Sequence, residues 1–405
     1  MTGRTPPTPT RDELVGRARE LLPAIRARAK ATEALRRLPD ETMGELFAAG
    51  FLRICQPARY GGYEMAWGTH MAVARELARG CASTAWIVSV VGMHAVIAGR
   101  MQQRLQDAVW GDTRDMLIAT GSPPTTGKIR RVPGGYLVSG GWRFTSGVDH
   151  AGWIGITAPV QGEDGSLLPN ARVLLRRDEI EIVDTWFVSG MCGTGSKDIH
   201  VPDIVLPDWR VDEAARNFGK SPAGAAVNPH AYIYDVEFAP YFGVSIFAPM
   251  VGAAAGALAD YVAMTRDRKG VHFGTDVRSL SPVQQRVAES AAEIKSAELL
   301  LDNTLALLHQ RGLARQALAP EELAEVGLHR AYVAKLCVEA VTRLVRQMGA
   351  SGLSDDNPVQ RHYRDVTTMA TQIGANWDVH AGQYGRHLLG LPLQYRAGSA
   401  TPKLA

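Results

Sequence analysis

Gly141-Trp142-Arg143-Phe144-Thr145-Ser146-Gly147 is the stretch from which the fold of this chain can be worked out. Alternating apolar residues from Tyr136 onward precede it and predict a strand that ends at Gly147. Because side chains alternate along a strand, we expect Trp142, Phe144 and the Ser146 hydroxyl on one face. An aromatic wall beside a hydroxyl suits a flat, redox-active ring. The plainer alternative is a core Trp with a Ser at the rim.

The composition is that of a nearly neutral protein with two or three domains. The 405 residues include 44 Lys and Arg against 41 Asp and Glu, a net charge of +3, which indicates neither a nucleic-acid nor a membrane partner. The four cysteines have no metal or redox spacing, which favours a reducing compartment. The polar opening residues do not read as a signal peptide, and the apolar runs 85–98 and 244–259 are too short or interrupted for a membrane span. We therefore expect a cytoplasmic protein.

The order of the predicted elements indicates an α+β fold with three domains. Helical periodicity over residues 1–114 predicts an N-terminal α-helical domain. Short apolar runs between Gly and Pro turns over residues 115–212 predict a small antiparallel, barrel-like β domain. Residues 213–405 then form a bundle, preceded by a loop without a clear period over 210–243. Its four long helices are expected at 247–265, 282–309, 321–349 and 357–389.

Three stretches resemble the acyl-CoA dehydrogenase superfamily, and the resemblance extends over nearly the whole chain. The stretch 142–147 resembles that family's flavin-contacting strand, and the stretch 190–199 resembles its β-domain turn. The stretch 347–352, followed by Arg364 and Asp365, resembles its C-terminal glycine loop and Arg-Asp helix. The resemblance implies the same fold: a helical domain, a small β domain and a four-helix bundle.

The carboxylate with which acyl-CoA dehydrogenases remove a substrate proton is missing. No Glu lies between Val366 and Leu389, and the helix expected from Phe247 to Ala259 has no carboxylate. Without a base, hydride removal from an acyl-CoA cannot begin.

Other residues resemble the family's branch of two-component flavin-dependent monooxygenases, the group of the p-hydroxyphenylacetate hydroxylase oxygenases. Trp86 and His94 resemble the substrate-side Trp and His of that branch, and Ser122 resembles a second polar residue there. Ser146 matches the Ser that binds flavin N5, and His380 matches a second active-site His. The resemblance thus implies that His94, His380 and Ser146 are catalytic and that Trp86, His94 and Ser122 bind substrate. Because His94 and His380 come from opposite ends of the chain, we expect the pocket where the three domains join.

The resemblance also implies a set of flavin-binding residues. These are Trp142, Thr145, Ser146, Ser122, Arg266, Arg268, Phe273, Gln347 and Gly349. The two arginines and Phe273 resemble residues of a neighbouring subunit that reach the flavin tail, with plain surface charge as the alternative. Cys192 stands where relatives usually have Arg, so one contact is expected to be lost.

These residue types suit oxygen transfer from a reduced flavin. Reduced FMN, with FAD as the alternative, would react with O₂ to a C4a-hydroperoxide that hydroxylates an aromatic, phenolic or polyketide-like substrate. A His with a pKa near 6.5 would deprotonate the phenol. The sequence has no metal-spaced His/Cys set, and it has no Gly-x-Gly-x-x-Gly between a strand and a helix, so we expect a separate NAD(P)H:flavin reductase. By resemblance the protein is a homotetramer. The alternatives are N-oxidation of an amino sugar and an acyl-CoA dehydrogenase-like protein without the catalytic Glu.

Overall fold

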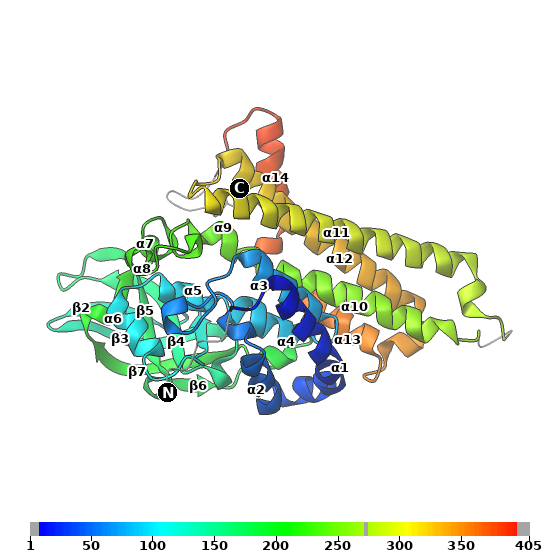
Figure 1. Cartoon of the computed structure of the whole chain (residues 1–405), viewed down its shortest axis with the longest axis horizontal. Helices are drawn as coiled ribbons and strands as arrows, with labels where there is room; N and C mark the ends of the chain where they lie inside the picture. The colour runs from blue at the N-terminus through cyan, green and yellow to red at the C-terminus, as the bar shows by residue number, and fades with distance from the viewer. Residues whose placement is uncertain (1–7, 271–273, 395–405) are drawn as a thin grey trace.

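The computed structural model describes residues 8–270 and 274–394 (Figure 1). A β-sheet forms one end of the molecule and three long helices form the other, with the N-terminal helices between them. The N-terminal helices are α1 (Arg11–Leu35), α2 (Asp40–Ala48), α3 (Trp67–Ala78), α4 (Ala82–Trp86), α5 (His94–Gly99) and α6 (Gln103–Trp110). A π-helical turn over Ile87–Val91 joins α4 to α5.

The sheet has eight strands. They are β1 (Ile118–Gly121), β2 (Lys128–Val132), β3 (Gly135–Thr145), β4 (Trp153–Gln161), β5 (Leu167–Arg176), β6 (Glu181–Val183), β7 (Lys197–Leu206) and β8 (Val211–Glu213). Their order is β6-β7-β3-β2-β4-β5-β8, with β1 beside β4. The sheet is mainly antiparallel, as expected, and β4 adds two parallel pairings, one with β1 and one with β2. Two strands were not predicted: β2, whose residues are largely basic, and the three-residue β8.

The end of β3 departs from regular strand geometry. Its register against β7 shifts between Trp142 and Thr145, and Phe144 has a positive φ of 60°. Trp142 is fully buried, whereas Phe144 is 53% exposed. The expectation that these two rings share one face is therefore wrong, because the irregular register interrupts the alternation of side chains.

The bundle contains α10 (Phe247–Arg266), α11 (Ser281–Leu313) and α12 (Pro320–Gln347) as long helices. The expected fourth helix over 357–389 is instead two, α13 (Pro358–Met369) and α14 (Trp377–Leu388). Polar side chains interrupt it, since Gln372 accepts a hydrogen bond from Gly374 N and Asn376 caps α14 through Val379 N. The expected loop before the bundle also contains three short helices, α7 (Ala214–Phe218), α8 (Ala223–Val227) and α9 (Phe238–Phe242).

The N-terminal helices and the bundle share one hydrophobic core. Helix α10 lies so close to α3 that glycine is required at the contact. A Cβ on Gly252 would lie 2.1 Å from the Arg75 carbonyl oxygen, and one on Gly256 would lie 2.6 Å from that of Arg79. The sheet encloses a second core.

Two helical stretches of the described chain, Ala82–Gly99 and Phe238–Arg266, are long and apolar enough to cross a membrane. In the most apolar 18-residue window of each stretch, 94% and 72% of the residues are buried inside the protein. Burial of this extent is typical of core helices, which pass the same test of length and composition.

Candidate active site

A cavity of about 660 Å³ lies where the three parts of the chain meet. The N-terminal helices contribute Trp86 and His94 to its wall, and the β domain contributes Thr120, Ser122 and Ser146. The segment before α10 and the end of α13 close the remaining sides. The structure thus brings Trp86, His94, Ser122 and Ser146 together, as the sequence predicts.

His94 is held in one tautomer. Its Nδ1 lies 2.8 Å from the Ile118 carbonyl oxygen, which can only accept, so Nδ1 carries the proton. Nε2 is then an acceptor, and the Thr120 hydroxyl 3.1 Å away donates to it. The ring stacks on Phe242 with the centroids 5.9 Å apart.

Burial keeps His94 neutral. Burial is the main cause that lowers the pKa of His94 to about 4; the hydrogen bond to Ile118 acts in the opposite direction, and the positive charge of Arg172 adds a smaller lowering effect. The expectation of a pKa near 6.5 is therefore wrong. Arg172 is itself buried, and its guanidinium lies 4.6 Å from the centre of the Phe218 ring. His94 accordingly acts as a hydrogen-bond acceptor at neutral pH.

Ser146 heads a chain of hydrogen bonds whose direction the structure determines. Thr194 donates to the Met191 carbonyl at 2.9 Å, so Ser196 must donate to Thr194 and Ser146 to Ser196, both at 2.7 Å. The Trp86 indole N–H, which only donates, lies 3.2 Å from Ser146 Oγ. With its own proton committed, Ser146 presents a free lone pair to the cavity.

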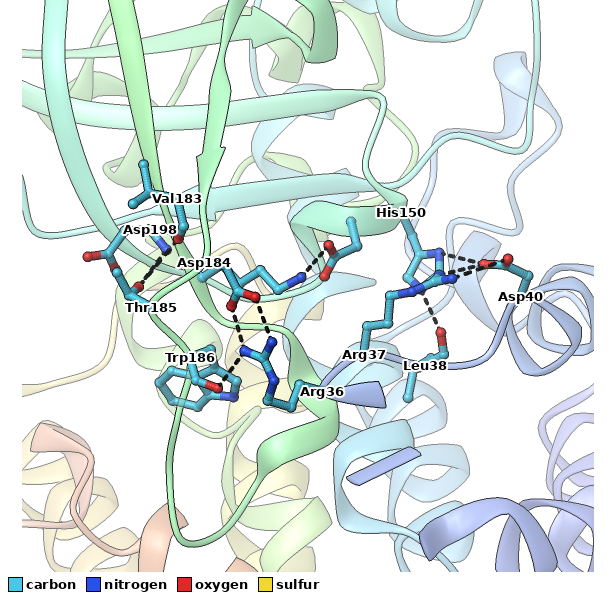
Figure 2. Close-up of polar contacts among 12 residues, drawn as sticks. Arg36, Arg37, Leu38, Asp40, His150, Val183, Asp184, Thr185, Trp186 and Asp198 are labelled. Carbon is cyan, nitrogen blue, oxygen red and sulfur yellow. Dashed lines mark hydrogen bonds and ion pairs between the residues drawn. The ribbon is translucent and has the colours of Figure 1, made fainter. Parts of the chain in front are cut away.

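The segment 184–196, which supplies part of the cavity wall, is fixed from the N-terminal side by Arg36 (Figure 2). Arg36 donates to both oxygens of Asp184, at 2.5 and 2.6 Å, and to the Trp186 carbonyl at 3.4 Å. This hydrogen-bonded ion pair lowers the pKa of Asp184. Trp186 is one of the cavity-lining residues.

Helix α13 holds the same segment from the other side. The buried Asp365 carboxylate accepts a hydrogen bond from Met191 N at 2.6 Å, and Arg364 donates to the Ser189 carbonyl at 2.7 Å. Burial raises the pKa of Asp365 to about 6. The Arg-Asp pair therefore connects the bundle to the cavity wall.

Comparisons with known proteins agree with this geometry. The sequence model of the acyl-CoA dehydrogenase N-terminal domain matches residues 8–105, and that of the C-terminal domain matches residues 244–377. The p-hydroxyphenylacetate 3-hydroxylase oxygenase component of Acinetobacter baumannii is 30% identical over 93% of this chain and 89% of its own. The chain belongs to the acyl-CoA dehydrogenase family. Within the family it is similar to the flavin-dependent oxygenases.

Further relatives define this branch of the family. The flavin-dependent monooxygenase oxygenase subunit HsaA of Mycobacterium tuberculosis is 33% identical over 92% of this chain and 94% of its own. A crystal structure of HsaA superimposes with a TM-score of 0.86, covering 95% of this chain and 98% of that one at 32% identity. XiaF from Streptomyces sp., solved with FADH2 and glycerol, has a TM-score of 0.88 at 25% identity and covers 94% and 96% of the two chains. This chain is the oxygenase component of a two-component flavin-dependent monooxygenase. The amino-sugar and acyl-CoA alternatives do not fit these relatives.

The residues at the cavity suit a flavin. Thr145 Oγ1 is buried without a hydrogen-bond partner among the described residues, and it lies 3.0 Å from where a Cβ on Gly121 would be. Ser146 offers its lone pair nearby, and Phe144 and Trp186 add aromatic surface to the wall. Ser146 and these rings would hold a flavin ring in the oxygenase, whereas Thr145 precedes Ser146 in the chain but does not itself line the cavity.

Trp142 and His380 also lie outside the cavity wall. Trp142 is enclosed in the core of the β domain, and its indole N–H donates to the Thr157 carbonyl at 3.2 Å. This is the position expected if Trp142 is a core residue and does not contact the flavin. His380 packs against Gly327 of α12, where a Cβ would lie 2.7 Å from its Nδ1. Burial lowers the pKa of His380 to about 4. His380 interacts with the backbone of Ile373, which does line the cavity. His380 itself is not in the wall, so it does not share the cavity with His94.

The residues predicted for the flavin tail gather at the far end of α10. Arg268 donates to the backbone carbonyl oxygens of Gln347 and Met348, next to Gly349 with its φ of 59°. Arg266 ends α10, a helix of 20 residues that starts beside the cavity and therefore spans about 30 Å. None of these residues lines the cavity. Phe273 lies outside the described residues.

Several residues of this site were not predicted from the sequence. Thr120 lies on β1 and Ser122 directly follows that strand, so an alternating pattern continued to Ser122 could have placed both hydroxyls on one face. Phe242 and Ser196 had no recognisable signal. They reach the cavity through packing between distant segments.

Proposed function

We propose that this oxygenase hydroxylates an aromatic substrate that carries a phenolic hydroxyl. The observation that supports this proposal is the fixed polarity of the polar end of the cavity. His94 accepts from Thr120, so the Thr120 oxygen has lone pairs for a ligand that donates. A phenolic O–H is such a donor, and the Ser122 hydroxyl also lines this end.

The flavin is the source of the redox chemistry. When bound in reduced form, it supplies the electrons and activates O₂, and one oxygen atom enters the substrate. Ser146 would accept a hydrogen bond from an N–H of the reduced ring, because its own proton goes to Ser196. Thr120 would accept a hydrogen bond from the phenolic hydroxyl while it donates its own proton to the neutral His94 ring, and together they would orient the phenol. Trp86, Val90 and Phe242 exclude water from the reacting atoms.

The wider arrangement follows the same reasoning. We infer that reduced FMN, or FAD as the alternative, arrives from a separate NAD(P)H:flavin reductase and that the enzyme works in the cytoplasm. We also infer a homotetramer in which Arg266, Arg268 and Gln347 of one subunit serve the flavin of another. The distance of about 30 Å along α10 supports this inference. His380 would then support the wall at Ile373.

A coupling assay tests the proposed function. The protein is mixed with reduced flavin, O₂ and a panel of phenols, and hydroxylated product and hydrogen peroxide are both quantified. Wild type should form product. Thr120→Val, which keeps the shape but loses the hydroxyl, should lower the ratio of product to peroxide about fivefold, since one hydrogen bond is worth about 1 kcal/mol.

Thr371→Val is the matched control, because Thr371 also lines the cavity but uses its hydroxyl on the Thr368 carbonyl. It should couple nearly as wild type does. An unchanged ratio in Thr120→Val, or no product from any phenol, would contradict the proposal.

A further inference from the structure

The chemical character of the cavity wall restricts the charge of the substrate. Among the described residues, none of the side chains that line the cavity is Asp, Glu, Lys or Arg. His94 is neutral at physiological pH. A carboxylate on the ligand would therefore lose its water without gaining a cationic partner.

The buried cation Arg172 does not change this conclusion. Arg172 lies against Phe218, outside the residues that form the wall. Both Thr120 and Arg172 lie close to Gly155: a Cβ placed on this glycine would be 3.1 Å from Thr120 Cγ2 and 3.8 Å from Arg172 Nη1. The Arg172 guanidinium is therefore near the end of the cavity that Thr120 lines. Its charge acts at the hydroxyl end of the cavity and leaves the rest of the wall without a countercharge.

An apolar path leads from the polar end towards the outside. Phe242, the last residue of α9, stacks on His94, and Ile246, which lies in the turn before α10, also lines the cavity. Ile246 Cδ1 lies 3.7 Å from where a Cβ on Gly374 would be, and the neighbouring Ile373 lines the cavity while 64% exposed. An apolar strip of Phe242, Ile246 and Ile373 therefore runs from His94 to the mouth, where the uncharged polar side chains of Thr371 and Gln372 lie beside it.

We propose that the substrate is an uncharged phenol with an apolar substituent, whose hydroxyl meets Thr120 and His94 while the substituent follows Phe242 and Ile246 towards Ile373. This inference rests on the proposed function for the position of the hydroxyl. It adds the charge and the shape of the remainder of the molecule. An acidic phenol of the same size would be rejected because its carboxylate would lie along the strip.

A binding experiment tests the proposal without turnover. Isothermal titration calorimetry under anaerobic conditions, with reduced flavin present, compares 3-(4-hydroxyphenyl)propionate with its methyl ester. The ester should bind roughly tenfold more tightly or better, because the carboxylate has no cationic partner. In a series of 4-alkylphenols, affinity should rise by up to about fourfold for each added methylene.

Two variants at the mouth locate the effect. Ile373→Arg places a cation where the strip ends and should tighten binding of the carboxylate about fivefold, while the ester changes less than about twofold. Ile373→Met is the matched neutral control and should change both ligands by the same small factor. Because Ile373 is largely exposed, neither variant disturbs the core.

The outcomes separate this proposal from the proposed function. If wild type binds the carboxylate as tightly as the ester, or if alkyl length has no effect, the uncharged, apolar substrate is refuted even when phenols are hydroxylated. If the ester is preferred but no phenol is ever hydroxylated, the proposed function fails while the selectivity of the cavity stands.

Discussion

Replacing Asp365 by Asn should make the protein more stable at neutral pH. Burial raises the pKa of this carboxyl from 3.8 to about 6, so the folded protein holds the proton more tightly than the unfolded chain. Stability is therefore lost as the pH rises from about 4 to 6, and above that range the loss is about 3 kcal/mol. Asn does not titrate, and its side-chain oxygen can still accept from Met191 N.

The assay is thermal unfolding followed from pH 4.5 to pH 8. With about 2.1 cal/mol/K of unfolding entropy per residue, 3 kcal/mol corresponds to about 3–4 °C for a chain of this length. Asp365→Asn should gain most of that difference at pH 8 and little of it at pH 4.5. Asp378→Asn, at an exposed position on α14, is the control and should show no such trend. A gain of equal size at both pH values, or no gain at pH 8, would refute the reasoning.

Two further predictions concern His94 and the assembly. Arg172→Met removes a positive charge that opposes protonation, so the pKa of His94 should rise above about 4 yet stay below 6.5, because burial remains the larger cause. A histidine titration by NMR measures this, and an unchanged or lower pKa would contradict the role given to Arg172. Light scattering at micromolar concentration should give four times the chain mass of 43.8 kDa. A monomer would contradict the proposal that Arg268 and Gln347 contact the flavin of another subunit.

The sequence predicted the order of the elements and part of the site well. Hydrophobic periodicity and Gly/Pro breaks are local properties, so α10, α11 and α12 appear close to their expected bounds. The resemblance of short motifs to the family also indicated Trp86, His94, Ser122 and Ser146, and the structure places all four at the cavity. The absence of the catalytic Glu could be read directly from the sequence.

Only the tertiary structure decided which of these residues meet and in what electrical state. Pairing of β3 with β7 turned Trp142 into the core and Phe144 outward, a change that no alternating pattern reveals. Enclosure by distant helices lowered the pKa of His94 and raised that of Asp365. Local sequence specifies backbone preference and chemical type, whereas burial, proton position and the neutral wall of the cavity depend on contacts between segments far apart in the chain.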